Sequence, residues 1–217
     1  MLNVFIDIET IPGPEKPKKS EVSPPGQMKK KETIAKWFAE NGETARDDLW
    51  KKQALESLKG RIVCIGFAVE DGPVETVYGK DEEELLFRFW GRVKELNGFG
   101  DNIRWIGFNL RSFDMNWLYH RAVKYGLKDL AIQIPRKRYA DSVVDIREIW
   151  NGKQDDRAKG TQDEIAVFLG SKRKTKDMDG SKVFGLWQKG QLSKIGEYCG
   201  EDVESVRDEY RKLEGTF

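Results

Sequence analysis

Residues 4–10 read VFIDIET, an apolar run that contains two carboxylates and a threonine. The run predicts a buried β-strand, because short apolar stretches rich in Val, Ile and Phe are typical of sheet interiors. Side chains alternate across a strand, so Asp7 and Glu9 share one face while Ile6 and Ile8 share the other. The two carboxylates are therefore expected to point the same way near the carboxyl end of this strand.

This pair of carboxylates has two interpretations. Two like charges in a partly desolvated place raise a carboxyl pKa unless a cation is present, and Mg²⁺ or Mn²⁺ would supply that charge. Alternatively, Glu9 ends the strand in solvent and Asp7 makes local backbone hydrogen bonds. The motif by itself leaves the two interpretations equally open.

The charge balance limits how the protein could bind a polyanion. Among its 217 residues, 38 Lys and Arg oppose 37 Asp and Glu, so the formal net charge is +1. Whole-molecule attraction to a polyanion is excluded, and nucleic-acid binding would depend on local basic patches. The candidate patches, each of which alone also reads as a solvated loop, are Lys16 with Lys18 and Lys19, and residues 29–31, 136–138 and 172–176.

Cysteine usage and hydropathy predict the compartment. Cys64 and Cys199 each lie among apolar residues, which is typical of reduced packing residues in a cytoplasmic protein. No stretch approaches the ~18 apolar residues of a membrane span, and the first residues lack the pattern of a signal peptide. We expect a soluble cytoplasmic protein without a membrane partner.

The hydrophobic pattern alternates strands with helices, as in α/β domains. Strands are predicted at residues 2–9, 60–71, 72–79, 103–109 and 138–146, and helices at 81–96, 112–125, 161–169 and 191–213. We therefore expect one α/β domain over residues 1–217, with a mixed five-stranded sheet flanked by helices. An insertion at about residues 13–60 is predicted to hold a Lys- and Pro-rich loop followed by one or two amphipathic helices.

A third carboxylate, Asp114, ends the sequence NLRSFD that follows the strand at 103–109. Ser112 is predicted to cap the next helix, which would place Asp114 in its first turn. The helix dipole favours an acid at that position. Taken alone, this segment favours a structural role for Asp114.

The last helix carries two further polar candidates. Apolar residues at steps of three and four predict a core stripe along residues 191–213, and Asp202 and Tyr198 fall about 60° and about 100° from its middle. Being four residues apart, they are stacked on one flank, between core and solvent. That position can offer side chains to a cleft, although an ordinary charged flank is an equal alternative.

Together these segments resemble a known superfamily. FIDIET (5–10), NLRSFD (109–114) and YCGED (198–202) resemble the three motifs of the DEDD superfamily of 3′–5′ exonucleases, the last in its tyrosine form. GRIVCIGFA (60–68), FDMNWLYHRAVKYGL (113–127) and KDMDGSKVFGLW (176–187) are similar to the predicted exonucleases related to the proofreading domain of family B DNA polymerases. The resemblance covers nearly the whole chain outside residues 13–60.

The resemblance implies a ribonuclease H-like fold with a site for two divalent ions, Mg²⁺ or Mn²⁺. Its ligands would be Asp7, Glu9, Asp114 and Asp202, with Asp7 bridging both ions. One ion would lower the pKa of a water to make the nucleophile, and the other would stabilise the leaving 3′ oxygen. Tyr198 would orient that water by hydrogen bonding, since its reference pKa near 10 makes it a poor base.

Four other residues receive smaller roles. Thr10 and Asn109 are assigned to substrate contacts, and Thr10 matches a family position near the terminal nucleotide. Asp145 could be a further ligand, but the sequence favours it as a cap for the following IREIW segment. The only histidine, His120, excludes the histidine form of the superfamily and is assigned a structural or surface role.

The resemblance implies a phosphodiester hydrolase that removes nucleoside 5′-monophosphates from the 3′ ends of single-stranded DNA. A 3′–5′ exoribonuclease of the ribonuclease D kind is the first alternative, because the same four carboxylates can cut either backbone. A non-catalytic nucleic-acid-binding domain on the same fold is the second. The complete set of four carboxylates and one tyrosine argues against it, and the sequence identifies no protein partner.

Overall fold

The computed structural model divides the chain into two compact units, Met1–Glu9 with Ile62–Phe217 and Thr10–Arg61. The structure describes residues 1–98, 102–137, 140–152, 159–171 and 179–217. It stays a prediction that residues 1–217 form one exonuclease domain with an insertion at about 13–60.

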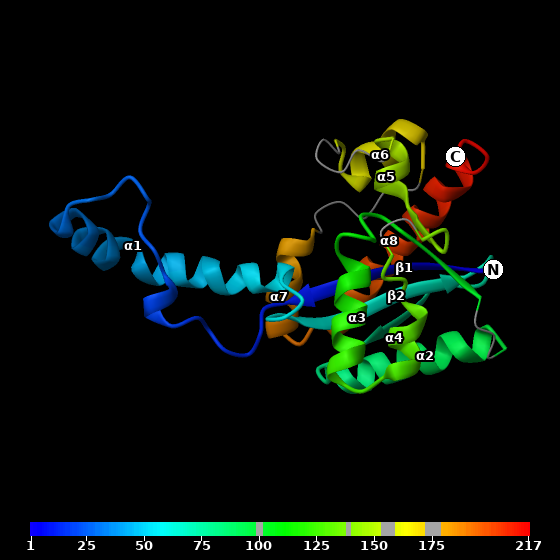
Figure 1. Cartoon of the computed structure of the whole chain (residues 1–217), viewed down its shortest axis with the longest axis horizontal. Helices are drawn as coiled ribbons and strands as arrows, with labels where there is room; N and C mark the ends of the chain where they lie inside the picture. Colours follow the sequence, from blue (N-terminus) through cyan, green and yellow to red (C-terminus); the bar gives the residue numbers. More distant parts are fainter. Residues whose placement is uncertain (99–101, 138–139, 153–158, 172–178) are drawn as a thin grey trace. The chain divides into compact units, whose positions relative to one another are not determined.

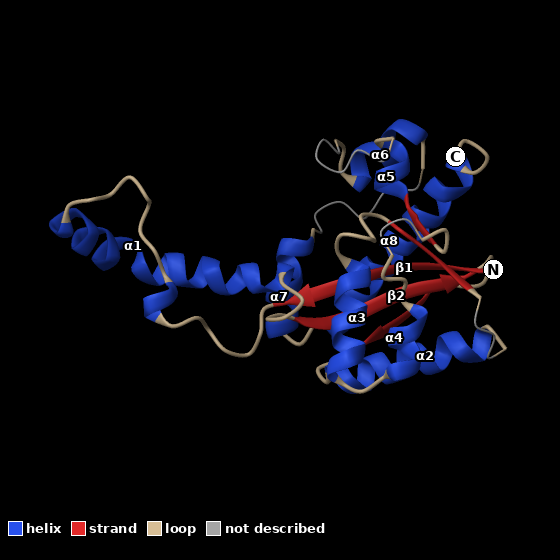
Figure 2. Ribbon diagram, viewed as in Figure 1, coloured by secondary structure: helices blue, strands red, loops and turns tan. Residues whose placement is uncertain are grey.

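A mixed five-stranded sheet forms the centre of the first unit. Its strands are β1 (Leu2–Ile11), β2 (Arg61–Val69), β3 (Glu75–Tyr78), β4 (Ile103–Gly107) and β5 (Val143–Asp145). They lie in the order β3-β2-β1-β4-β5. Strands β1, β4 and β5 are parallel, and β2 pairs with β3 in antiparallel fashion. Figure 2 shows β2 running opposite to β1. The predicted fold class, a five-stranded mixed sheet flanked by helices, is confirmed.

The helices of this unit include all four that the sequence predicted. Those four are α2 (Glu82–Leu96), α3 (Asp114–Lys124), α6 (Gln162–Leu169) and α8 (Leu192–Leu213). Three shorter helices are α4 (Lys128–Gln133), α5 (Ile146–Trp150) and α7 (Gly180–Gln188). The sequence indicated α5 only through Asp145 as a cap for IREIW, and it did not predict α4 or α7. Helices of a few turns show few apolar repeats, so the pattern marks them weakly.

The alternation along β1 separates two hydrophobic clusters. Ile6 and Ile8 are buried in a cluster with residues of α2 and α3. Phe5, on the opposite face, is buried with Val203 and Val206 of α8. Figure 1 shows α3 and α8 on opposite faces of the sheet. Asp7 and Glu9 follow Phe5 at two-residue steps and therefore lie on the face of the sheet that α8 covers.

Small residues let α8 approach the sheet closely. A β-carbon added to Gly66 of β2 would lie 2.9 Å from the carbonyl oxygen of Cys199, and one added to Gly196 would lie 2.6 Å from the ring of Tyr78. A larger side chain at either glycine would therefore force the helix or the ring to move. This close packing fixes the position of the first half of α8 relative to the sheet.

Two sequence predictions about local structure were wrong. The fifth strand covers only three residues, Val143–Asp145, rather than 138–146, and residues 138–139 lie outside the described residues. Ser112 does not cap α3, which begins at Asp114 with Phe113 as N-cap and no capping side chain. Residues 108–113 instead form a turn in which Asn109 adopts a φ of 55°.

The unit Thr10–Arg61 contains one long helix, α1 (Lys31–Lys52), between the short 3-10 helices η1 (Lys19–Glu21) and η2 (Gln53–Leu55). The predicted Lys- and Pro-rich loop is tied to α1. Trp50 donates to the carbonyl of Gly13 at 2.8 Å, and Arg46 donates to that of Pro17 at 2.6 Å. No residue of α1 is buried, which leaves the helix without the packed face that usually stabilises one.

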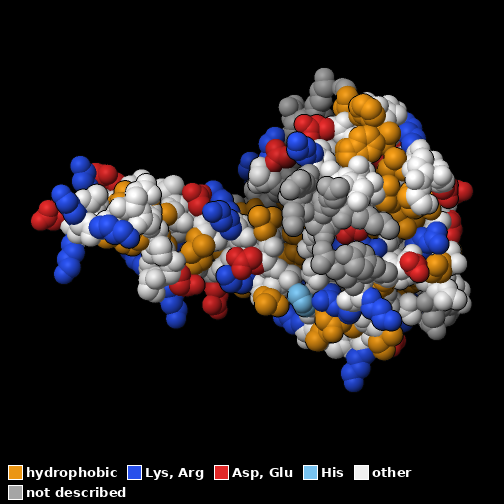
Figure 3. Space-filling view, turned by 45° about the horizontal axis from the view of Figure 1, so that its top comes forward, with side chains coloured by type: hydrophobic (Ala, Val, Ile, Leu, Met, Phe, Trp, Pro, Cys, Tyr) orange, Lys and Arg blue, Asp and Glu red, His pale blue; other side chains and the backbone are white. Residues whose placement is uncertain are grey.

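The surface mixes charges of both signs. Figure 3 shows acidic and basic side chains interspersed over the viewed face. None of the helices in the described residues is long and apolar enough to cross a membrane.

Candidate metal and active site

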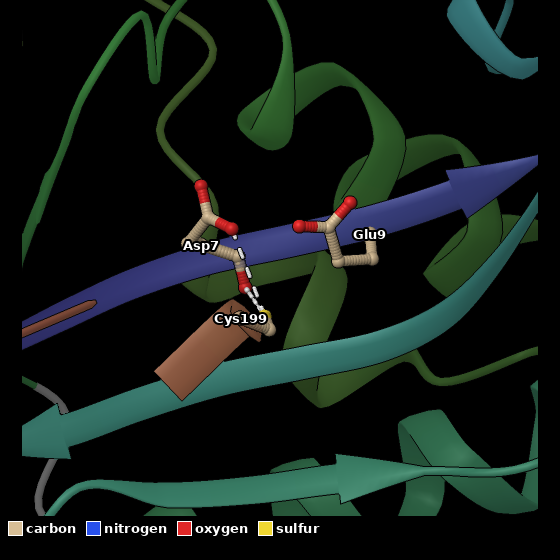
Figure 4. A group of neighbouring side chains, drawn as sticks. All are labelled: Asp7, Glu9 and Cys199. Carbon is tan, nitrogen blue, oxygen red and sulfur yellow. Dashed lines mark hydrogen bonds between the residues drawn. The ribbon is translucent and has the colours of Figure 1, made fainter. Parts of the chain in front are cut away.

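Strand β1 presents the two carboxylates of the first motif side by side (Figure 4). Ligand atoms of Asp7 and Glu9 and the thiol of Cys199 lie within 4.8 Å of one another. Asp7 and Glu9 come from β1, and Cys199 comes from α8. The alternation predicted from VFIDIET thus places both carboxylates on one face, under the helix that carries the third motif.

Asp114 joins this region from the start of α3. Its side chain is 3% exposed, and its Oδ1 atom accepts a hydrogen bond of 3.2 Å from the backbone N–H of Ile8. Burial raises the pKa of Asp114 well above its usual value, and the negative charges of Asp7 and Asp145 raise it further. The charges of Asp7 and Asp114 therefore repel each other, and this repulsion is smaller than the effect of burial on the pKa of Asp114.

Tyr198 and Asp202 are more deeply buried than the helical pattern predicted. The sequence placed them between core and solvent, but they are only 7% and 3% exposed. Burial raises the pKa of Tyr198, and the charges of Asp202, Glu9 and Asp7 raise it further, in that order. The phenol consequently stands among the same carboxylates and stays protonated.

The structure brings the predicted residues together unevenly. Among the described residues, the group with mutually close ligand atoms contains Asp7 and Glu9 but neither Asp114 nor Asp202. Asp114 accepts a hydrogen bond from the backbone of β1 through one carboxylate oxygen. The charge of Asp202 raises the pKa of Tyr198, which links Asp202 electrostatically to the same region. The roles of all five as metal ligands or catalytic groups stay predictions.

Three residues near the site were not identified from the sequence. Cys199, interpreted there only as a packing residue, lies 3.6 Å from Oδ2 of Asp7 through its Sγ atom. Gln162 of α6 is buried and donates to the backbone carbonyl of Asp202 at 3.3 Å. Asp163, beside it, is exposed and adds to the charges that raise the pKa of Tyr198. Only the position of Cys199, directly after Tyr198, offered a signal.

The thiol of Cys199 acts as a donor rather than as a ligand anion. Burial raises its pKa well above the usual 9.0, and the neighbouring Cys64 thiol and the charges of Asp7 and Glu9 add to the shift. A thiol binds metals as the thiolate. The ligand set for a cation therefore consists of carboxylate oxygens, which suits hard ions such as Mg²⁺ and Mn²⁺.

Asp145 is the helix cap that the sequence favoured. It caps α5 by accepting from the backbone N–H of Arg147 at 3.1 Å and also accepts from that of Arg111 at 2.9 Å. Burial raises its pKa. With both oxygens accepting backbone hydrogen bonds, Asp145 holds the loop before α3 against β5.

The predicted substrate contacts have protein partners in the structure. Oδ1 of Asn109 accepts from Arg147 at 3.1 Å. The hydroxyl of Thr10, in the unit Thr10–Arg61, donates to the carbonyl of Ala54 at 2.6 Å. Contact of either residue with a nucleotide stays a prediction.

His120 lies on α3 with its ring 5.9 Å from that of Tyr119.

Of the predicted basic patches, residues 172–176 and Arg138 lie outside the described residues.

Comparison with known proteins places the chain in a family. A family described as "Predicted 3'-5' exonuclease related to the exonuclease domain of PolB" matches residues 60–206. Among solved structures, the family B DNA polymerase from the hyperthermophilic archaeon Pyrobaculum calidifontis resembles the chain with a TM-score of 0.59 and 19% identity. The match covers 98% of this chain but 24% of the polymerase, and at this identity it supports the fold alone. No curated protein matches the chain in sequence. The chain belongs to the family of predicted 3′–5′ exonucleases related to the exonuclease domain of family B DNA polymerases.

Proposed function

We propose that this protein is a metal-dependent 3′–5′ exonuclease that releases nucleoside 5′-monophosphates from the 3′ ends of single-stranded DNA. The observation that supports it best is the convergence of Asp7 and Glu9 with the third-motif helix, next to the buried Asp114. Membership in a family of predicted exonucleases supports the same reaction class.

The carboxylate oxygens would suit hard divalent ions such as Mg²⁺ or Mn²⁺. Asp7, Glu9, Asp114 and Asp202 are the residues that would hold them. The pKa of Asp114 is raised first by burial and then by the charge of Asp7, and bound cations would offset that repulsion. When bound, Mg²⁺ or Mn²⁺ supplies positive charge that stabilises phosphoryl oxygens and activates water.

Tyr198 is assigned to position water rather than to remove its proton. Its pKa lies above the usual value of 10.0 because the phenol is buried among carboxylates. A protonated phenol can donate one hydrogen bond and accept another. It can therefore orient an attacking water without acting as a general base at neutral pH.

The proposed substrate is a terminal nucleotide of a flexible single strand. A cluster of carboxylates repels phosphate, so productive binding requires both the ions and a flexible end that can bend over them. Asn109 is assigned to a contact with that terminal nucleotide, and a nucleotide contact of Thr10 stays an expectation from the resemblance. Since phosphate and sugar contacts carry little base information, cleavage should depend only slightly on sequence.

The test is cleavage of end-labelled single strands in Mg²⁺ or Mn²⁺. Stepwise release of 5′-monophosphates from linear DNA is expected, with slower cutting of blunt duplexes and no cutting of a circular single strand or of a strand closed by a 3′-phosphate. Asp7→Asn should abolish the activity, whereas Asp129→Asn, the same change at an exposed position on α4, should preserve it.

The other outcomes identify the alternatives. Faster cleavage of RNA than of DNA would make the protein an exoribonuclease on the same site. Efficient cleavage of the circle would show an endonuclease. Binding of single strands without any cleavage in either metal would support a non-catalytic domain.

A further inference from the structure

A surface groove lies at the edge of the sheet opposite the carboxylates. It has a volume of about 880 Å³, and its lining includes Met1, Ile103 and Ser142, which stand at the amino ends of β1, β4 and β5. At about 3.3 Å per residue, Leu2 lies roughly 23 Å along β1 from Glu9. The groove is thus separate from the candidate active site.

The floor of the groove is aliphatic and accessible. Ile132 of α4 is 78% exposed and Met1 is 62% exposed, and Ala131, Ile134 and Pro135 complete the apolar lining. A ligand that covered these exposed isoleucine and methionine side chains would bind more tightly. Each Å² of apolar area removed from water contributes about 25 cal/mol to the free energy of binding. A ligand with apolar side chains would gain this free energy.

The rim of the groove is basic. Lys128, Arg136 and Lys137 belong to its lining, and no residue in the described lining is acidic. Arg136 is held in place, because its guanidinium lies 4.2 Å over the ring of Tyr119 and donates to Asn116 at 3.2 Å. An arginine fixed in this way suits a carboxylate, whose two oxygens match the guanidinium fork.

The lining favours a peptide over a nucleic acid. Single-stranded nucleic acids bind by stacking bases on exposed aromatic faces. Tyr119 is the aromatic residue in the described lining, and the guanidinium of Arg136 already covers one of its faces. The aliphatic floor offers van der Waals contact to Leu, Ile or Phe side chains instead.

We propose that this groove docks an acidic segment of a partner protein, with apolar side chains on the aliphatic floor and carboxylates on the basic rim. Lys128 and Ile132 are four residues apart on α4 and both line the groove, so one helix presents a charge contact and an apolar contact together. Docking here would tether the enzyme to a partner while its carboxylate site stays open.

The experiment measures fluorescence anisotropy of short labelled peptides in which Glu alternates with Leu or with Phe. We expect the intact protein to bind at least one of them, with affinity that falls as salt rises. Peptides with Lys in place of Glu, or Gly in place of Leu, should not bind. Failure of both acidic peptides to bind would overturn the proposal.

Variants localise the binding to the groove. Lys128→Glu and Ile132→Ser should each weaken peptide binding by about tenfold or more. Their matched controls are Lys189→Glu and Val123→Ser, the same changes at exposed positions outside the groove lining, and these should bind normally. If the control variants lost as much peptide affinity as the groove variants, the peptide would not bind in the groove.

Two further measurements exclude other occupants. An oligonucleotide that displaces the peptide, or that loses affinity in Lys128→Glu and Ile132→Ser, would make the groove a nucleic-acid surface. Self-association that Ile132→Ser abolishes would make it an interface between copies of this chain. Nuclease assays of Lys128→Glu and Ile132→Ser should match wild type, so the proposal stands or falls independently of the exonuclease reaction.

Discussion

The Sγ atom of Cys199 lies 3.5 Å from the backbone oxygen and 3.6 Å from Oδ2 of Asp7, which joins the third-motif helix directly to the first-motif strand. Cys199 is fully buried and its thiol stays protonated, so it can donate to the carboxylate. The contact restricts the orientation of a predicted metal ligand.

We therefore expect Cys199→Ala to weaken Mn²⁺ binding about three- to tenfold, because Asp7 loses a partner that orients it. Cys199→Ser keeps a donor and should retain most of the affinity. Calorimetric titration of Mn²⁺ into both variants measures this, alongside urea melts that report folding. Equal affinity in wild type and Cys199→Ala would reduce Cys199 to a packing residue.

Asp7→Asn should abolish cleavage and yet raise the melting temperature of the metal-free protein. The charge of Asp7 is one cause of the raised pKa of Asp114, so removing it relieves a repulsion. Mn²⁺ at a hundred times its Kd should stabilise the wild type by about 2.7 kcal/mol and the variant much less. Thermal melts with and without Mn²⁺ test both effects, and a wild type indifferent to Mn²⁺ would remove the metal site.

Tyr198→Phe should slow the chemical step by roughly 10- to 1,000-fold, since the variant cannot hydrogen-bond a water. Metal and DNA binding should stay near normal, because the phenyl ring fills the same buried space. Single-turnover cleavage separates the chemical step from binding. Unchanged turnover would exclude Tyr198 from the reaction, whereas lost Mn²⁺ binding would give it a different role.

Gly66→Ala should destabilise the protein by about 1–3 kcal/mol and reduce cleavage, because the added methyl group meets the backbone of Cys199. Gly91→Ala on α2 is the matched control. A β-carbon there meets no atom within 4 Å, so this change should be neutral or stabilise the helix by up to about 1 kcal/mol. Urea denaturation compares the two variants, and equal stability would mean that α8 tolerates displacement.

His120 should titrate below its usual pKa of 6.5, first because of partial burial and then because of the charges of Arg136 and Arg121. The folded state then binds this proton less readily than the unfolded state. The free energy of unfolding should fall as the pH drops through 6.5 and level off below the folded-state pKa. NMR of the single histidine gives the pKa, and His120→Gln should flatten this part of the stability curve. A pKa at or above 6.5 would contradict the expectation.

The sequence determined the fold class and most of the elements. The period-two run around Asp7 and the long apolar stripe of α8 are local patterns, and burial of one face makes such patterns decisive. The sequence also identified Asp145 as a cap, since Asp before IREIW is a local signal. It failed at Ser112 because Asn109, in a left-handed conformation, redirects the chain before α3 begins.

The tertiary structure alone decided which side chains meet. Cys199 and Asp7 are 192 residues apart, and only the close seating of α8 over Gly66 brings the thiol to the carboxylate. The backbone carbonyl of the buried Asp202 likewise accepts a hydrogen bond from Gln162 of α6, 40 residues away. A periodic pattern gives the direction in which a side chain leaves its own helix, but distances between elements are set by how their surfaces pack.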